Sequence, residues 1–187
     1  MKTFLSRSIS IIIVLAFFVK PCWAQLSLAD TSTRIYLVRH AEKDTGNNPG
    51  LTAAGRQRAG DLLRFMQDRH IQRIYTTPYR RTQMTTDSMR IQLGIDTVQY
   101  KADTTGEGLI KRITELNDMR RPILIVGHSN TILRIARALG VDDPGPLDIP
   151  DNEYDNVFLV KYKNGKAELV KWKYGALSKP ASPKAMQ

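Results

Sequence analysis

The sequence predicts a single α/β domain in three layers, with a mostly parallel central sheet flanked by helices and an antiparallel hairpin at its C-terminal end. Two observations predict this fold class. Short β-branched or aromatic runs alternate with helical patterns along residues 35–139, as they do in βαβ units. Two runs of alternating polarity then surround Asn164-Gly165, a pair typical of a type I′ hairpin turn.

The elements are expected in the following order. Runs rich in Ile, Val and Tyr predict strands at 35–38, 74–76, 97–100 and 123–126. Apolar periodicity predicts helices at 52–69, 79–93, 105–119 and 129–139, and Gly94, Pro122 and Gly140 mark helix ends. The hairpin strands, at 157–162 and 167–174, are expected at one edge of the sheet.

The first 24 residues have the features of a secretory signal peptide. Lys2 and Arg7 precede an apolar run at 9–19, and Cys22 and Ala24 supply small residues before a cut after Ala24. The run is shorter than the roughly 20 residues that span a bilayer. An uncleaved anchor and a lipid-anchored Cys22 are the alternatives. We therefore expect an exported bacterial protein, periplasmic or secreted, with a domain at 25–177 and a polar, disordered tail at 178–187.

Cleavage after Ala24 would leave 163 residues, enough for one domain with a packed core, and would remove the only cysteine. The basic residues would fall from 28 to 25 against 18 acidic ones, a net charge of +7. This charge favours an anionic partner. Nucleic acid is not expected, because the basic residues are scattered and no binding motif accompanies them.

Ionisable residues gather where the predicted strands end. Arg39-His40 follows the first strand, Arg80-Arg81 lies just beyond the second, and His128 follows the fourth. The carboxyl ends of parallel strands are where α/β proteins bind ligands. Arginine forks bind phosphate oxygens, and an imidazole can attack phosphorus. The sequence lacks an H-E-x-x-H metal motif and a G-x-S-x-G elbow, and His70 reads as a surface residue.

The chain resembles the histidine phosphatase superfamily, in its phosphoglycerate-mutase-like branch. The resemblance covers about residues 35–140 and rests on four motifs in order: LVRHAEK at 37–43, LTAAGRQRA at 51–59, TTPYRRTQMT at 76–85 and VGHSNT at 126–131. It implies a phosphomonoesterase that needs no metal or other cofactor and acts on a small phosphate ester.

The resemblance also implies roles for individual residues. His40 aligns with the nucleophile that becomes phosphohistidine, and its other ring nitrogen is expected to donate to a backbone carbonyl. Arg39 and Arg81 align with the arginines that bind phosphate, although the neighbouring Arg80 stays an alternative to Arg81. His128 aligns with a histidine that donates to the phosphoryl oxygens.

The general acid is less defined. Glu107 is favoured by its spacing and Asp103 is its rival, but both also suit the start of a helix, as an N-cap and a first-turn acid. Asn47 is a further candidate phosphate ligand, with Asn48 as an alternative, although this stretch also reads as a plain turn. Aromatic residues that would line the cleft, or else belong to the core or hairpin, are Tyr79, Tyr154 and Trp172.

Two departures from the family pattern bear on function. Ala41 replaces the commoner glycine after the nucleophile, and the chain has no room for the long insertions of the mutases. Both favour a phosphatase, with substrate choice set by loops 44–50 and 142–155. The main alternative is a module that binds a phosphorylated ligand in the same pocket but lacks an effective acid. The sequence does not settle the oligomeric state.

Overall fold

The computed structural model describes residues 33–178. The predicted signal peptide and nearly all of the predicted tail therefore lie outside the described residues. Six strands form one sheet in the order β3-β2-β4-β1-β5-β6. Their bounds are β1 Arg34–Arg39, β2 Arg73–Thr76, β3 Thr97–Gln99, β4 Ile123–Gly127, β5 Asn156–Lys163 and β6 Lys166–Lys173.

The first four strands are mutually parallel, whereas β5 runs antiparallel to β1 and β6 runs antiparallel to β5. The predicted mixed sheet with a C-terminal hairpin at one edge is confirmed. Asn164 and Gly165 have φ angles of 52° and 76°, as a type I′ turn requires.

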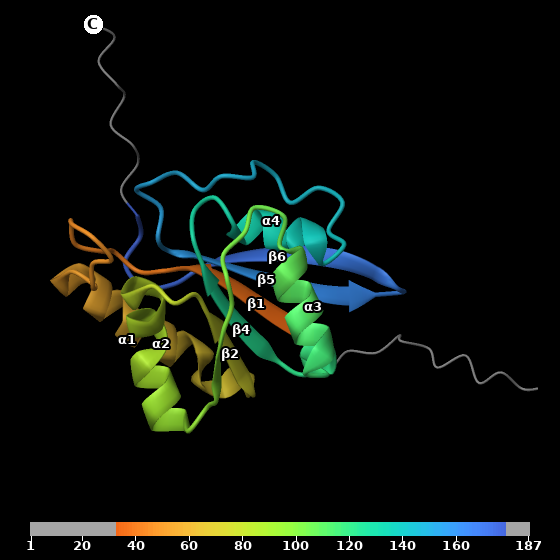
Figure 1. The fold of residues 1–187 in the computed structure, drawn as a ribbon, viewed down its shortest axis with the longest axis horizontal. Helices are drawn as coiled ribbons and strands as arrows, with labels where there is room; N and C mark the ends of the chain where they lie inside the picture. The colour runs from red at the N-terminus through yellow and green to blue at the C-terminus, as the bar shows by residue number, and fades with distance from the viewer. Residues whose placement is uncertain (1–32, 179–187) are drawn as a thin grey trace, which may run out of the picture.

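Helices cover both faces of the sheet (Figure 1). They are α1 Ala53–Met66, α2 Arg80–Leu93, α3 Glu107–Glu115 and α4 Ile132–Ala138, with short 3-10 turns at Gln67–Arg69 and Asp118–Arg120. The predicted helix at 129–139 begins later than expected, because Thr131 Oγ1 accepts from His128 N–H and forms a tight turn there. No helix within residues 33–178 is long and apolar enough to cross a membrane.

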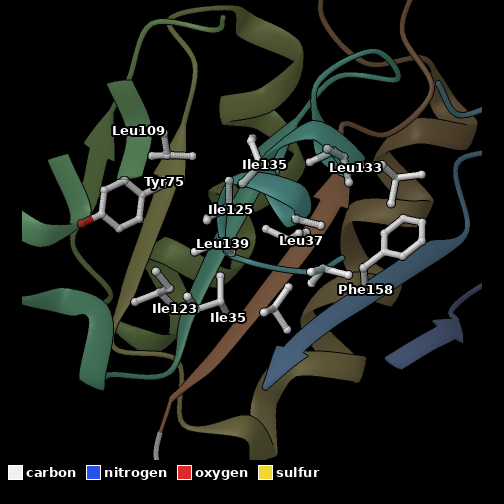
Figure 2. Close-up of a cluster of buried hydrophobic side chains, with 14 of the residues drawn as sticks. Ile35, Leu37, Tyr75, Leu109, Ile123, Ile125, Leu133, Ile135, Leu139 and Phe158 are labelled. Atoms are coloured by element: carbon white, nitrogen blue, oxygen red, sulfur yellow. The ribbon is translucent and has the colours of Figure 1, made fainter. Parts of the chain in front are cut away.

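Alternation along the strands builds the two cores. In β1, Ile35 and Leu37 face α3 and α4, while Tyr36 and Val38 face the opposite side and pack with Leu62 of α1. Figure 2 shows the first of these clusters between the sheet and its two helices. Because β1 and β4 are buried on both faces, they read as continuous apolar runs.

Helix α1 packs unusually close to the segment that follows β1. Thr52 caps α1, its hydroxyl accepting from Gly55 N–H at 3.0 Å. A Cβ at Gly55 would overlap the carbonyl oxygen of Glu42, so only glycine fits at this contact. Gly55 is therefore more than a tolerated glycine near the helix start, because it sets the distance between α1 and the residues after His40.

We expect Gly55→Ala to destabilise the protein by about 2 kcal/mol or more, because the methyl group meets backbone that cannot move cheaply. Gly60→Ala, in the same helix, is the matched control, since the nearest atom to its added Cβ is Arg64 Nη1 at 3.6 Å. The free energy of unfolding of Gly60→Ala should rise by about 0.5–1 kcal/mol, because alanine has a higher helix propensity than glycine. Urea unfolding measures the stability of both variants. Equal changes in the free energy of unfolding would contradict the claim that only glycine fits at position 55.

Candidate active site

The strand order brings the predicted site residues together. Strands β2, β4 and β1 are neighbours, so their carboxyl ends meet at one edge of the sheet. His40 N–H donates to Gly127 O at 3.0 Å, which joins the end of β1 to the end of β4. An open pocket of about 500 Å³ lies there, lined by Arg39, His40, Lys43, Tyr79, Arg81, His128, Ser129, Asn130 and Asp151.

His40 is held as a neutral base. Its side chain is buried, and Nδ1 lies 2.8 Å from the carbonyl oxygen of Ala41. A carbonyl only accepts, so Nδ1 carries the hydrogen and Nε2 keeps its lone pair. Burial, and after it the charge of Arg39, lowers the pKa of His40 to about 3. The predicted contact of one ring nitrogen with a backbone carbonyl is confirmed, and it leaves the lone pair of Nε2 unused by this contact.

Arg39 organises the loop at 142–155. Its Nη1 lies 2.9–3.1 Å from three carbonyl oxygens of this loop, at Pro150, Asp151 and Glu153. Its guanidinium carbon sits 4.2 Å from the centre of the Tyr154 ring. Burial lowers the pKa of Arg39, yet backbone oxygens and the ring face compensate for lost water.

The structure selects Arg81, not Arg80, as the pocket arginine. Arg81 lies over the Tyr79 ring at 4.3 Å, and its Nη2 is 3.4 Å from His128 Nδ1. Burial lowers the pKa of Arg81. Arg80 is exposed and does not line the pocket, although its backbone N–H donates to Asn48 Oδ1 at 3.0 Å.

His128 faces His40 across the pocket. The two ring centres are 5.4 Å apart. The centres of the Tyr79 and His128 rings are also 5.4 Å apart, in a T-shaped arrangement. His128 Nε2 lies 3.2 Å from the hydroxyl of Thr77, a residue that is fully buried. Burial first, and then the charges of Arg81 and Arg39, lower the pKa of His128 to about 4.

The two candidate acids do not line this pocket, contrary to expectation. Glu107 borders a second cavity, of about 410 Å³, between α3 and α4. Asp103 Oδ1 accepts from the N–H and hydroxyl of Thr105 at 2.9 Å and from Gly106 N–H. Burial alone would raise the pKa of Asp103, but these hydrogen bonds outweigh it and lower the pKa. Glu107 lies in the first turn of α3, as the helix-start alternative expected. Asp103 is not the N-cap, which is Gly106, and it forms a turn just before the helix instead.

Sequence reasoning missed the carboxylate that does line the pocket. Asp151 makes an ion pair with Arg39 at 3.6 Å, although its side chain is 97% exposed. Asn47 is exposed and outside the pocket lining, so its role as a phosphate ligand stays a prediction. Of the three aromatics, Tyr79 lines the pocket and Tyr154 supports Arg39, whereas Trp172 stacks on Tyr36 beside the core.

A buried ion pair fixes the segment after His40. Arg58 Nε donates to both carboxylate oxygens of Glu42, at 2.8 and 2.9 Å, and Arg58 Nη1 donates to Tyr174 O at 3.3 Å. Ala41 N–H donates to Thr85 Oγ1 at 2.9 Å, which joins the same segment to α2. Within residues 33–178, no three His, Cys, Asp or Glu side chains are grouped to hold a metal ion.

The neutral imidazoles should make stability depend on pH. An unfolded histidine titrates near 6.5, whereas the folded pKa values are about 3 and about 4. Between these values the unfolded chain binds more protons, so the free energy of unfolding falls as the pH falls. Each imidazole should lower it by on the order of 2 kcal/mol between pH 7 and pH 5.

Urea unfolding at the two pH values tests this expectation. The loss between pH 7 and pH 5 should be smaller in His40→Asn than in the wild type. It should be unchanged in His70→Asn, because His70 is exposed. A wild-type stability that is flat over this range would contradict the assigned protonation states.

Part of the chain is similar to a known protein family. Residues 35–104 match the model of the histidine phosphatase superfamily, branch 1, and they include His40, Arg39 and Arg81. Among curated protein sequences, none matches the chain.

Several solved structures share the fold. The proposed phosphohistidine phosphatase SixA of Agrobacterium tumefaciens has a TM-score of 0.58 at 23% identity, covering 78% of this chain and 100% of its own. A mycobacterial glucosyl-3-phosphoglycerate phosphatase has a TM-score of 0.57 at 14% identity, covering 77% and 100%. A phosphoserine phosphatase of Entamoeba histolytica has a TM-score of 0.56 at 14% identity, covering 79% and 98%. Residues 35–104 are therefore similar to branch 1 of the histidine phosphatase superfamily, and the described domain shares the fold of these solved phosphatases.

Proposed function

We propose that the protein is a phosphomonoesterase that forms a phosphohistidine on His40 Nε2 and requires no metal ion. The observation that carries the proposal is the neutral, buried imidazole of His40 in a pocket that it shares with two arginines and a second histidine. Supporting it, one fold relative was solved with vanadate, and the same phosphatase was solved with inorganic phosphate.

The proposed reaction has two steps. His40 Nε2 attacks phosphorus, the bond to the ester oxygen breaks, and the alcohol leaves with a proton. Water then attacks the phosphohistidine, the P–N bond breaks, and inorganic phosphate leaves while Nε2 regains its lone pair. Arg39 and Arg81 hold the three equatorial oxygens, whose negative charge the transition state spreads. These fixed cations supply the positive charge that a metal would otherwise provide.

A binding module for phosphorylated ligands is the second candidate. The observation that favours it is that neither Glu107 nor Asp103 lines the pocket. Such a module would bind phosphate or vanadate with the same arginines but would not turn over an ester.

The proposal predicts that His40→Ala abolishes hydrolysis of p-nitrophenyl phosphate, with a loss of about 10³-fold or more in kcat. Wild-type activity should survive an excess of chelator, and rapid quenching should trap phosphate on His40. Turnover that is unchanged in His40→Ala would disprove the mechanism. If the wild type binds vanadate without turnover from pH 4 to pH 9, the binding module is favoured.

Adjacent arginines provide a second test. Arg81→Ala should lower kcat/KM by about 10²-fold, because a charged donor to the transition state is lost. Arg80→Ala is the matched control, with an expected change below about threefold, the scale of screened surface charge effects. Equal losses in both variants would show that the phosphate is bound differently.

We also propose that the protein is exported and cleaved after Ala24. The basic start, the short apolar run and the small residues before the cut support this location. The mass of the protein recovered from the cell envelope and medium would test it, since an intact chain in the cytoplasm contradicts export.

A further inference from the structure

The proposed reaction needs a group that gives a proton to the departing oxygen, and the pocket offers few. Glu107 and Asp103 do not line it. Asp151 does, but its side chain is 97% exposed and is paired with the Arg39 guanidinium. Lys43 and Tyr79 line the pocket too, but both are exposed. His128 is buried and faces His40, so we consider His128 as the proton carrier.

A chain of two buried hydroxyls fixes which nitrogen of His128 carries hydrogen. Thr82 Oγ1 lies 2.9 Å from Thr77 O and 2.8 Å from Tyr79 O, so its single hydrogen points to these carbonyls. Thr77 Oγ1 lies 2.9 Å from Thr82 Oγ1 and must therefore donate to it. Thr77 Oγ1 is left with lone pairs toward His128 Nε2, at 3.2 Å. The hydrogen of this contact belongs to Nε2.

The other side of the ring gives the same tautomer. His128 Nδ1 lies 3.4 Å from Arg81 Nη2, and a guanidinium only donates. Nδ1 therefore presents a lone pair. It points to the side of Arg81, which lines the pocket, whereas Nε2 points to Thr77, which is fully buried and does not line it. In the free protein, His128 has no N–H directed at the phosphate.

We propose that the Thr77–Thr82 hydroxyl pair positions His128 so that Nδ1 serves as the proton carrier of the reaction, a role that goes beyond donating to the phosphoryl oxygens. This inference rests on the proposed phosphatase function. When a monoanionic ester binds, Nδ1 takes the proton of the phosphate. As the bond from phosphorus to the ester oxygen breaks, that proton passes to the oxygen and the alcohol leaves neutral. In the second step Nδ1 takes a proton from the attacking water and returns it to the departing phosphate.

The charges around His128 suit this cycle. The pocket around His128 is lined by the basic residues Arg39, Lys43 and Arg81, and Asp151 is the one carboxylate among its lining residues. The imidazole of His40 is neutral, and the ring of Tyr79 packs against His128 in a T-shaped arrangement. Burial first, and then the charges of Arg81 and Arg39, lower the pKa of His128 to about 4 and keep the ring neutral. A bound phosphate would bring negative charge next to His128, and this charge favours the protonated imidazolium form of the ring. His128 therefore gains a proton with the substrate and loses it with the product.

Nitrogen NMR of the full chain tests the tautomer without any turnover. The protein has three histidines, so labelled imidazole nitrogens can be assigned with His40→Asn and His70→Asn variants. Free wild type at pH 7 should show hydrogen on His128 Nε2 alone, and inorganic phosphate should protonate Nδ1 as well. Thr77→Ser should keep this pattern, whereas Thr77→Val should lose the preference for Nε2. Hydrogen on Nδ1 in the free protein, or no change with phosphate, would overturn the proposal.

Kinetics on esters with different leaving groups tests the proton transfer. Loss of a general acid harms poor leaving groups most, typically by about 10²-fold or more. Thr77→Val should therefore lose about 10²-fold in kcat on an alkyl phosphate but no more than about tenfold on p-nitrophenyl phosphate. Thr77→Ser should restore both rates.

The comparison variant is Asp151→Asn. If Asp151→Asn alone shows the selective loss on alkyl esters, the carboxylate is the donor and the proposal is wrong. If the wild type shows the expected tautomer but hydrolyses no ester, the proposed phosphatase function is wrong. The role of His128 as a proton carrier is then wrong as well.

Discussion

The structure depends on burying positive charge at the carboxyl edge of a parallel sheet. Two guanidinium groups and two imidazoles share one pocket, and the single carboxylate that lines it is largely in water. Isolated buried charges are costly, so neighbouring groups must replace water. Carbonyls of the loop at 142–155 and the Tyr154 face do this for Arg39, and the Tyr79 face does it for Arg81. The imidazoles avoid the penalty by staying neutral.

This constraint explains why elements distant from the pocket matter to it. The Arg58–Glu42 pair, the close approach at Gly55 and the Thr85 hydroxyl all hold the few residues after His40. Each contact acts on residue 41 or 42, next to His40, where the carbonyl of Ala41 contacts the imidazole. A shift of this segment would rotate the imidazole away from its carbonyl. Packing of α1 and α2 therefore serves the chemistry as well as the core.

The sequence predicted what local patterns determine. Apolar periodicity located the four α-helices of residues 33–178, and β-branched or alternating runs located the six strands, but the two 3-10 turns were merged into neighbouring helices. Strand ends located Arg39, His40 and His128. Arg80 and Arg81 could not be told apart, because the choice depends on how α2 faces the sheet. Glu107 was misplaced relative to the pocket, since a turn around Asp103 directs that segment toward α4. The contact between Arg39 and Tyr154 spans 115 residues, so no local signal could have shown it.

The two histidines illustrate how one residue type acquires two roles. His40 gives its hydrogen to a backbone carbonyl through Nδ1, while the partners of His128 place hydrogen on Nε2. The rings are thus in opposite tautomers, with their centres 5.4 Å apart. The lone pair of His128 Nδ1 lies 3.4 Å from Arg81 Nη2. Neutral bases attack phosphorus or take protons, whereas imidazolium ions do neither. The same desolvation that keeps both rings neutral also strengthens the attraction between the two arginines and an anion that binds beside them. The desolvated pocket therefore favours two things at once, which are the binding of phosphate by the arginines and the neutral form of the two imidazoles.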